Sequence, residues 1–289
     1  QTARMMERLE PILLEEKPDW VLIYGDTNST LAGALTAAKL GMPIAHVEAG
    51  LRSFETHMPE EINRRVADHL STLLFSPTKG ATQQLKKEGF SSRQIVEVGD
   101  VMWDALLLFQ EIARRRSTIL KKFDLENREF ILATVHRAIN TDETKNLSQI
   151  LEALNALSKD WPVVLPLHPR TRAKLPATFK PANSLFITEP LGYLDMLQLE
   201  REAEVIVTDS GGVQKEAFFF KVPCVTLRET TEWEELVQFG WNHLVPPMHF
   251  SALVETVQSV RGKLGQEANL YGDGTAASQI VSALTPGIN

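Results

Sequence analysis

Several of the apolar runs that predict β-strands in this sequence end in side chains that can transfer protons. Asp26 follows residues 20–24, and residues 43–47 lead directly into Glu48, with His46 one step before the end of the run. Carboxyl groups act as general acids and bases where a cleft of low dielectric constant raises their pKa. The structural alternatives are that Asp26 only caps the next helix and that His46 is a scaffold residue.

In the second half of the chain, the corresponding positions carry groups that bind anions. His136 and Arg137 close residues 130–135, and His168 and Arg170 follow the next apolar run. Ligands of parallel α/β sheets bind beyond the carboxyl ends of the strands. We therefore expect a cleft between two domains, with acid–base groups on one wall and anion-binding groups on the other.

The segment Asp209-Ser210-Gly211-Gly212 joins an apolar run to an amphipathic stretch. Asp209 or Ser210 can cap a helix that begins there, and glycine lets the backbone take a positive φ or lets a ligand come close. The free N–H groups of such a helix end suit an anion such as phosphate. A plain strand-to-helix turn without a ligand is the alternative.

Apolar runs alternate with amphipathic stretches along most of the chain, which predicts an α/β protein with parallel sheets covered on both faces. The predicted strands are residues 20–24, 43–47, 73–76, 94–98, 130–135, 163–167, 185–188, 205–208 and 223–227. The predicted helices are residues 29–40, 60–70, 78–88, 147–158, 213–220 and 275–284. Residues 114–129, the most charged segment, are the predicted linker between a first domain, 1–113, and a second domain, 130–289, that includes the final helix.

The composition narrows the class of protein. The 289 residues carry a formal net charge of −7, and the densest basic cluster, residues 114–116, is too short for a nucleic-acid surface. One cysteine, Cys224, allows neither a disulfide framework nor a cysteine metal cluster. We find no run of membrane-spanning length and no signal peptide. The composition favours a cytoplasmic enzyme or binding protein.

An ordered set of motifs resembles the non-hydrolysing UDP-N-acetylglucosamine 2-epimerase family. The motifs are HVEAGLRS, MPEEINR, VHRAINTD, LHPRT, TDSGGVQKEA, TTEWEE and NLYGDGTAASQI. The resemblance implies a glycosyltransferase-B-like fold, with two Rossmann-like domains and a nucleotide sugar between them. It also implies anti elimination of UDP to give 2-acetamidoglucal, followed by re-addition with the opposite configuration at C2, without NAD or a metal. A homodimer is expected, because relatives commonly pair through their first domains.

The resemblance also implies roles for individual residues. It assigns acid–base catalysis to Asp26, Glu48 and Glu60, and stabilisation of the departing UDP to His136, with Arg137 as a phosphate partner. The remaining substrate-binding residues that it implies are Ser210, Gly211 and Gly212 for the diphosphate, Glu216 for the ribose hydroxyls, and Leu191 and Met196 for uracil. For Glu61 we expect a surface or supporting role, and for Tyr193 a core position rather than a uracil platform.

The sequence departs from the family pattern at three positions. Ile139 stands where an acid is usual, Lys215 replaces the first of two acids, and Trp233 stands where many bacterial members have an arginine. Tryptophan at that place also occurs in relatives that act on oxidised or diacetamido UDP-sugars. The strand and Arg-Pro-Glu segment with which family members begin are not found before Asp26, so we expect a shortened first domain.

Besides the non-hydrolysing UDP-N-acetylglucosamine 2-epimerase, four alternative functions are to be weighed against these residues. A hydrolysing epimerase that releases UDP and free N-acetylmannosamine shares the motifs, and an epimerase of a modified UDP-sugar would also have them. A glycosyltransferase of the same fold needs no proton exchange at C2, so acids converging on one carbon argue against it. The alternative from another class is an inactive UDP-sugar-binding fragment, which the expected shortening of the first domain motivates.

Overall fold

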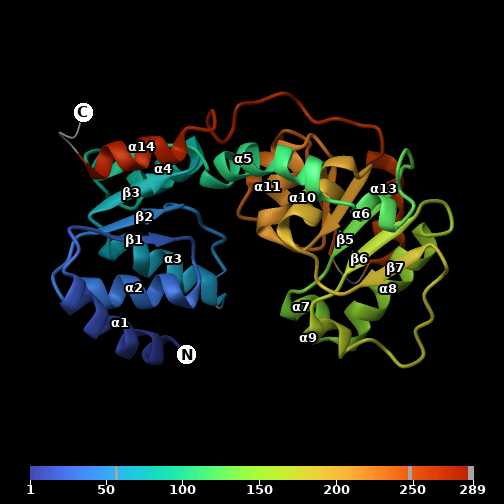
Figure 1. Cartoon of the computed structure of the whole chain (residues 1–289), viewed down its shortest axis with the longest axis horizontal. Helices are drawn as coiled ribbons and strands as arrows, with labels where there is room; N and C mark the ends of the chain where they lie inside the picture. The colour runs from blue at the N-terminus through green and yellow to red at the C-terminus, as the bar shows by residue number, and fades with distance from the viewer. Residues whose placement is uncertain (56–57, 247–248, 286–289) are drawn as a thin grey trace. The chain divides into compact units, whose positions relative to one another are not determined.

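The chain forms two compact α/β units, each built on its own parallel sheet (Figure 1). The structure is a computed structural model that describes residues 1–55, 58–246 and 249–285. The first unit comprises residues 1–104 together with the segment that begins at residue 269, and the second comprises residues 105–268. Two parallel sheets with helices between successive strands confirm the predicted fold class.

The first unit has a 4-stranded sheet in the order β1-β2-β3-β4. Its strands are β1 (Val21–Tyr24), β2 (Ile44–Val47), β3 (Leu73–Ser76) and β4 (Ile95–Glu97). Its helices are α1 (Thr2–Glu16), α2 (Asn28–Lys39), α3 (Pro59–Leu70), α4 (Lys79–Lys87) and α14 (Ala276–Leu284). Alternate strand residues face opposite sides, so Ile44 packs with α1, α2 and α3, whereas Ala45 packs with α14.

The second unit has a 6-stranded sheet in the order β10-β9-β8-β5-β6-β7. Its strands are β5 (Ile131–Thr134), β6 (Val163–Pro166), β7 (Leu185–Thr188), β8 (Val205–Thr208), β9 (Cys224–Thr226) and β10 (Asn242–Leu244). Its helices are α6 (Ile119–Lys122), α7 (Ala138–Thr141), α8 (Thr144–Leu157), α9 (Pro169–Arg172), α10 (Tyr193–Glu202), α11 (Gly211–Phe219), α12 (Glu234–Gln238) and α13 (Phe250–Val260). In this order β5, β8 and β9 are neighbours, so the segments that follow them lie at one edge of the sheet.

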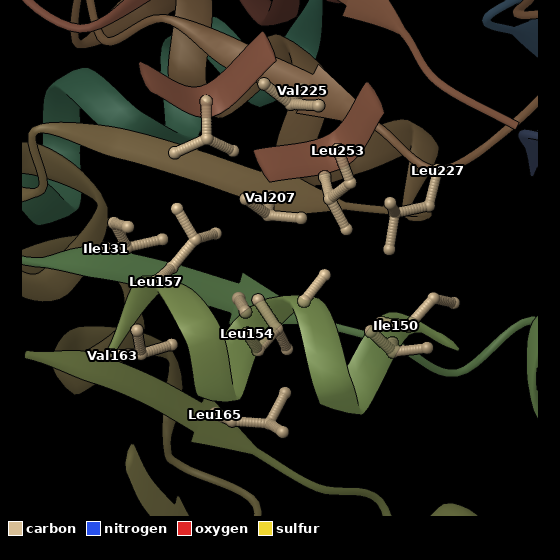
Figure 2. Close-up of a cluster of buried hydrophobic side chains, with 14 of the residues drawn as sticks. Ile131, Ile150, Leu154, Leu157, Val163, Leu165, Val207, Val225, Leu227 and Leu253 are labelled. Carbon is tan, nitrogen blue, oxygen red and sulfur yellow. The ribbon is translucent and has the colours of Figure 1, made fainter. Parts of the chain in front are cut away.

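Helices α8 and α13 cover one face of the second sheet (Figure 2). Leu154 of α8 and Leu253 of α13 lie over the inward-facing strand residues, and both are almost completely buried. Helices α6, α10 and α11 cover the other face, where Leu132 and Ile206 point. This core gives the carboxyl ends of β5, β8 and β9 a rigid base.

The unit boundaries differ from the predicted domain boundaries. Helix α14 packs through Ala276 and Ile280 against the first sheet, so the final helix does not belong to the second unit. The segment 114–129 is not a structureless linker. Helix α5 (Val101–Arg116) contains the boundary at residue 104, and Ile119 and Leu125 lie in the core of the second unit. Charge alone was misleading here, because the few apolar residues in that segment are the ones that pack.

Candidate functional site

Two of the predicted catalytic acids follow neighbouring strands of the first sheet. Strands β1 and β2 pair in parallel with Tyr24 opposite Val47, so Asp26 and Glu48 leave the sheet at the same edge. A Cβ atom added to Gly25 would lie 3.6 Å from Glu48 Oε2, which places that carboxylate beside the turn that carries Asp26. Glu48 has a φ of 73°, in the left-handed region that residues with side chains rarely adopt. Such strain is typical of residues held for function.

Helix α3 brings further polar groups to Asp26. Arg64 forms an ion pair with the Asp26 carboxylate, and Asn63 Nδ2 donates to the Asp26 carbonyl at 2.8 Å. Glu60 is half-buried in the first turn of α3 and precedes Arg64 by four residues, so the two share a face of the helix. The three predicted acids therefore belong to adjoining elements on one side of the first unit.

Glu61 is a buried supporting residue, with only 1% of its surface exposed. Its Oε2 accepts hydrogen bonds from Ser53 N at 2.9 Å and Ser53 Oγ at 3.1 Å, and lies 3.4 Å from Arg64 Nη1. Of the two expected roles, surface or supporting, the structure shows the supporting one. Glu61 instead fixes Arg64, which contacts Asp26.

His46 is a buried scaffold residue beneath the same turn. Its Nδ1 lies 2.7 Å from Asp68 Oδ1 and its Nε2 lies 2.7 Å from the Gly25 carbonyl oxygen. Both partners can only accept, so both ring nitrogens carry a proton. Burial alone would lower the pKa of His46, but the hydrogen bond and charge of Asp68 outweigh it and raise that pKa above its usual value. Asp68 is held in turn by Arg52 at 2.7 Å.

In the second unit, a fully buried carboxylate organises the segment after β5. Asp209 accepts from the backbone N–H groups of His136 at 3.0 Å and Arg137 at 2.9 Å, and from Asn140 Nδ2 at 2.9 Å. Burial would raise the pKa of Asp209, but these donors and the His136 ring hold it below its usual value. His136 Nδ1 lies 3.0 Å from Asp209 Oδ1 while the side chain is half-exposed, which leaves Nε2 for a ligand.

The turn before α11 is built as a capped helix end. Ser210 Oγ accepts from Val213 N at 3.4 Å, as the N-cap prediction required. Gly211 and Gly212 are helical residues, and neither has a positive φ. A Cβ atom at residue 211 would lie 2.4 Å from Glu232 Oε1, so a larger residue there would require the Glu232 side chain to move.

Glu232 lies beside this turn and contacts two arginines. Its carboxylate lies 2.7 Å from Arg228 Nη1 and 3.9 Å from Arg137 Nη2. Glu232 and Arg228 follow β9, the neighbour of β8, and were not singled out from the sequence. Cationic groups and a capped helix end together form an environment that suits a diphosphate.

The predicted nucleoside-binding residues lie on α10, α11 and the segment before α10. Glu216 of α11 is nearly buried and hydrogen-bonds with Glu200 and with Tyr193, both on α10. Leu191 and Met196 are partly buried against the core. Tyr193 is 43% exposed, so the expectation of a core position was wrong. Its ring packs edge-on against Phe109 at 5.9 Å between centroids.

Two of the three departures from the family pattern touch one another. Lys215 is buried, and its Nζ lies 4.3 Å from the centre of the Trp233 ring, which is also buried. A cation over an indole face is a favourable contact. Trp233 therefore packs in the interior, against Lys215. The third departure, Ile139, is 60% exposed.

The hydrogen bond of the His168 side chain is a local one within its own segment. Its Nδ1 accepts from Arg170 N at 3.3 Å as an N-cap of the short helix α9.

Within the described ranges, no cluster of three metal-ligating side chains occurs, and no helix is long and apolar enough to cross a bilayer.

Comparison with known proteins identifies close relatives over the whole chain. A family model described as UDP-N-acetylglucosamine 2-epimerase matches residues 1–285. A Pseudomonas aeruginosa protein named UDP-2,3-diacetamido-2,3-dideoxy-D-glucuronate 2-epimerase is 50% identical, over 98% of this chain and 79% of its own. A UDP-N-acetylglucosamine 2-epimerase homolog of Methanococcus maripaludis is 47% identical, over 98% of this chain and 80% of its own.

Solved structures agree with this result. The crystal structure of the Methanocaldococcus jannaschii UDP-GlcNAc 2-epimerase in complex with UDP-GlcNAc and UDP has a TM-score of 0.92 and 42% identity, covering 99% of this chain and 81% of its own. The Neisseria meningitidis UDP-GlcNAc 2-epimerase bound to UDP-GlcNAc has a TM-score of 0.89 and 32% identity, covering 98% of this chain and 80% of its own.

Proposed function

This chain belongs to the UDP-N-acetylglucosamine 2-epimerase family, and from that premise we propose that it inverts C2 of a UDP-N-acetylglucosamine-type sugar. The observation that carries the proposal is the grouping of Asp26, Glu48 and Glu60 on adjoining elements of the first unit. Inversion at C2 needs a group that removes the proton and a group that returns one to the other face. Carboxyl groups beside buried polar networks suit both tasks.

The proposed reaction has two halves that balance. In the first, a carboxylate takes the proton from C2 while the bond between C1 and the UDP oxygen breaks, giving 2-acetamidoglucal, UDP and a protonated acid. In the second, UDP adds back to C1 and a carboxylic acid gives a proton to the opposite face of C2. We assign the proton transfers to Glu48 and Glu60, and we assign Asp26 to hold or relay a proton next to them.

The second unit would bind the departing UDP. His136 would meet the charge that develops on the leaving phosphate, with Arg137 beside it. Ser210, Gly211 and Gly212 would hold the diphosphate at the end of α11. Glu216 would accept the ribose hydroxyls, and the segment with Leu191 and Met196 would contact uracil. The substrate cleft between the domains stays a prediction from the sequence.

The substituents of the sugar have two candidates. Close relatives are named for UDP-N-acetylglucosamine and for UDP-2,3-diacetamido-2,3-dideoxy-D-glucuronate. The Trp233 ring is buried against Lys215, a contact that identifies neither sugar. Turnover measured on both nucleotide sugars with the same preparation decides the matter.

The proposal is tested by solvent exchange at C2 in Glu60→Gln. The amide keeps the size of the side chain but removes the exchangeable proton. We expect deuterium incorporation from heavy water to slow about 10²- to 10⁴-fold, with UDP affinity nearly unchanged. Glu111→Gln, at an exposed acid paired with Arg114, is the matched control and should exchange at the wild-type rate.

The outcomes separate the alternatives. Wild-type exchange in Glu60→Gln would refute the carboxylate assignment and remove the main argument against a glycosyltransferase. Free sugar plus UDP as products would identify a hydrolysing epimerase. Silence of the unaltered chain with UDP binding retained would identify an inactive binding fragment.

The homodimer and the cytoplasmic location stay proposals. Light scattering coupled to size-exclusion chromatography tests the first, and cell fractionation tests the second.

A further inference from the structure

Two buried carboxyl groups hydrogen-bond to one another next to the turn assigned to the diphosphate. Glu200 on α10 is 1% exposed and Glu216 on α11 is 7% exposed, and their side chains share a hydrogen bond. Two carboxyl groups can form that bond only if one of them carries a proton. We therefore expect the pair to hold one proton.

The deeper burial of Glu200 favours this residue as the one that carries the proton. Its Oε2 is buried without a hydrogen-bond partner among the described residues, which an ionised oxygen would tolerate poorly. Burial and the nearby charge of Glu216 raise the pKa of Glu200 well above its usual value. Tyr193, two turns before Glu200 on the same face of α10, also hydrogen-bonds Glu216. Glu216 thus stands between a carboxylic acid and a phenol.

We propose that Glu200 is a positioning residue that, as a neutral carboxylic acid, donates to Glu216 and holds its carboxylate ready for the two ribose hydroxyls. The inference rests on the proposed function, in which Glu216 is the ribose acceptor. A carboxylate fixed before binding loses little side-chain entropy when the nucleoside arrives. The consequence is selectivity for a ribonucleotide over its 2′-deoxy analogue.

The same arrangement makes binding depend on pH. The titratable groups facing Glu200 are Tyr193 on its own helix, Glu216 on α11 and the buried thiol of Cys224 on β9. Helix α6 also packs on α10, but its Lys121 and Lys122 are exposed. When the pair loses its proton, two like charges adjoin in a buried place and repel. Affinity for the ribonucleotide then falls as pH rises.

The test compares affinities for UDP and 2′-deoxy-UDP in Glu200→Leu, Glu200→Gln and the unaltered chain. Titration calorimetry should give the unaltered chain roughly a 10-fold preference for UDP, the loss expected for a hydrogen bond to a charged group. Glu200→Leu should reduce this preference to within about 2-fold, while binding of the diphosphate part persists. The amide of Glu200→Gln can still donate a hydrogen bond to Glu216, so this variant should keep the preference for UDP. Because the amide does not titrate, the affinity of this variant for UDP should not fall at high pH.

Folding is controlled in the same variants. Leucine removes the donor to the buried Glu216 carboxylate, so the melting temperature of Glu200→Leu should fall somewhat, and a single cooperative unfolding transition shows that the variant still folds. An unchanged preference for UDP in Glu200→Leu, with Glu216→Ala abolishing it, would overturn the positioning role alone. If the unaltered chain does not bind UDP, the proposed function fails and this inference fails with it.

Discussion

Replacing Asp209 by Asn should lower the free energy of unfolding of the second unit substantially. The carboxylate accepts from two backbone N–H groups, at His136 and Arg137, and from Asn140, all inside the protein. An amide in its place turns one accepting oxygen into a donor that faces these donors. Losing two hydrogen bonds to a buried charge costs about 3–5 kcal/mol. For a unit of this size, that lowers the melting temperature by roughly 10 °C.

The effect depends on pH in a defined direction. Because the pKa of Asp209 is lowered in the folded protein, its contribution is complete above the usual value of 3.8 and is lost as pH falls through the folded pKa. The unfolding free energy of the unaltered chain should therefore fall more steeply in acid than that of Asp209→Asn. At neutral pH the difference between the two proteins should be largest.

Two measurements check this expectation. Urea unfolding followed by circular dichroism gives the free energy, analysed for the second unit if the two units unfold separately. Hydrogen exchange reports the local effect, since the amides of His136 and Arg137 should exchange faster. Asp142→Asn is the control, because Asp142 is an exposed acid paired with Arg170 and Lys174 and should change little. Equal stability of Asp209→Asn and the unaltered chain would refute the reasoning.

Two further predictions concern His46 and Gly211. Because the pKa of His46 is raised on folding, its stabilisation is complete below the usual 6.5 and is lost as pH rises through the folded pKa. His46→Gln should remove that alkaline decline in unfolding free energy, and an identical pH profile would contradict the buried imidazolium. Gly211→Val places a side chain against Glu232 and should weaken UDP binding by roughly 10-fold or more, measured by calorimetry, with a smaller effect on folding. Normal UDP binding would show that the turn holds no anion.

The strands were predictable from the sequence because a buried parallel strand is a continuous apolar run. All of the predicted runs are strands in the structure, and each end agrees with the prediction to within one residue. Strand β10 was missed because Asn242-His243-Leu244 is polar and short. Asn242 is buried there because its amide donates to Gln214 and its oxygen accepts from Thr226, a pairing that no local pattern shows.

The candidate site was predictable only where a residue follows a strand or opens a helix. The position of Arg64 four residues after Glu60 was a usable signal, since i and i+4 residues share a helical face. Glu200 had no signal, because it sits in an ordinary charged helix and becomes buried only when α10 packs against α11. The partner of the final helix was equally hidden, since periodicity shows which face of a helix is apolar but not which sheet it covers.

The contact between Lys215 and Trp233 limits which single substitutions are tolerated at these two positions. The family resemblance implies an acid at 215 and, in many bacterial members, an arginine at 233, whereas this chain has a lysine over an indole. Changing Trp233 alone to arginine would put two cations together in a buried space, and changing Lys215 alone to glutamate would set a carboxylate against the indole face. Each single step is therefore unfavourable, although both end states are compatible with the fold. Among homologues, lysine at 215 should occur together with an aromatic residue at 233, and an alignment in which the two positions vary independently would contradict this coupling.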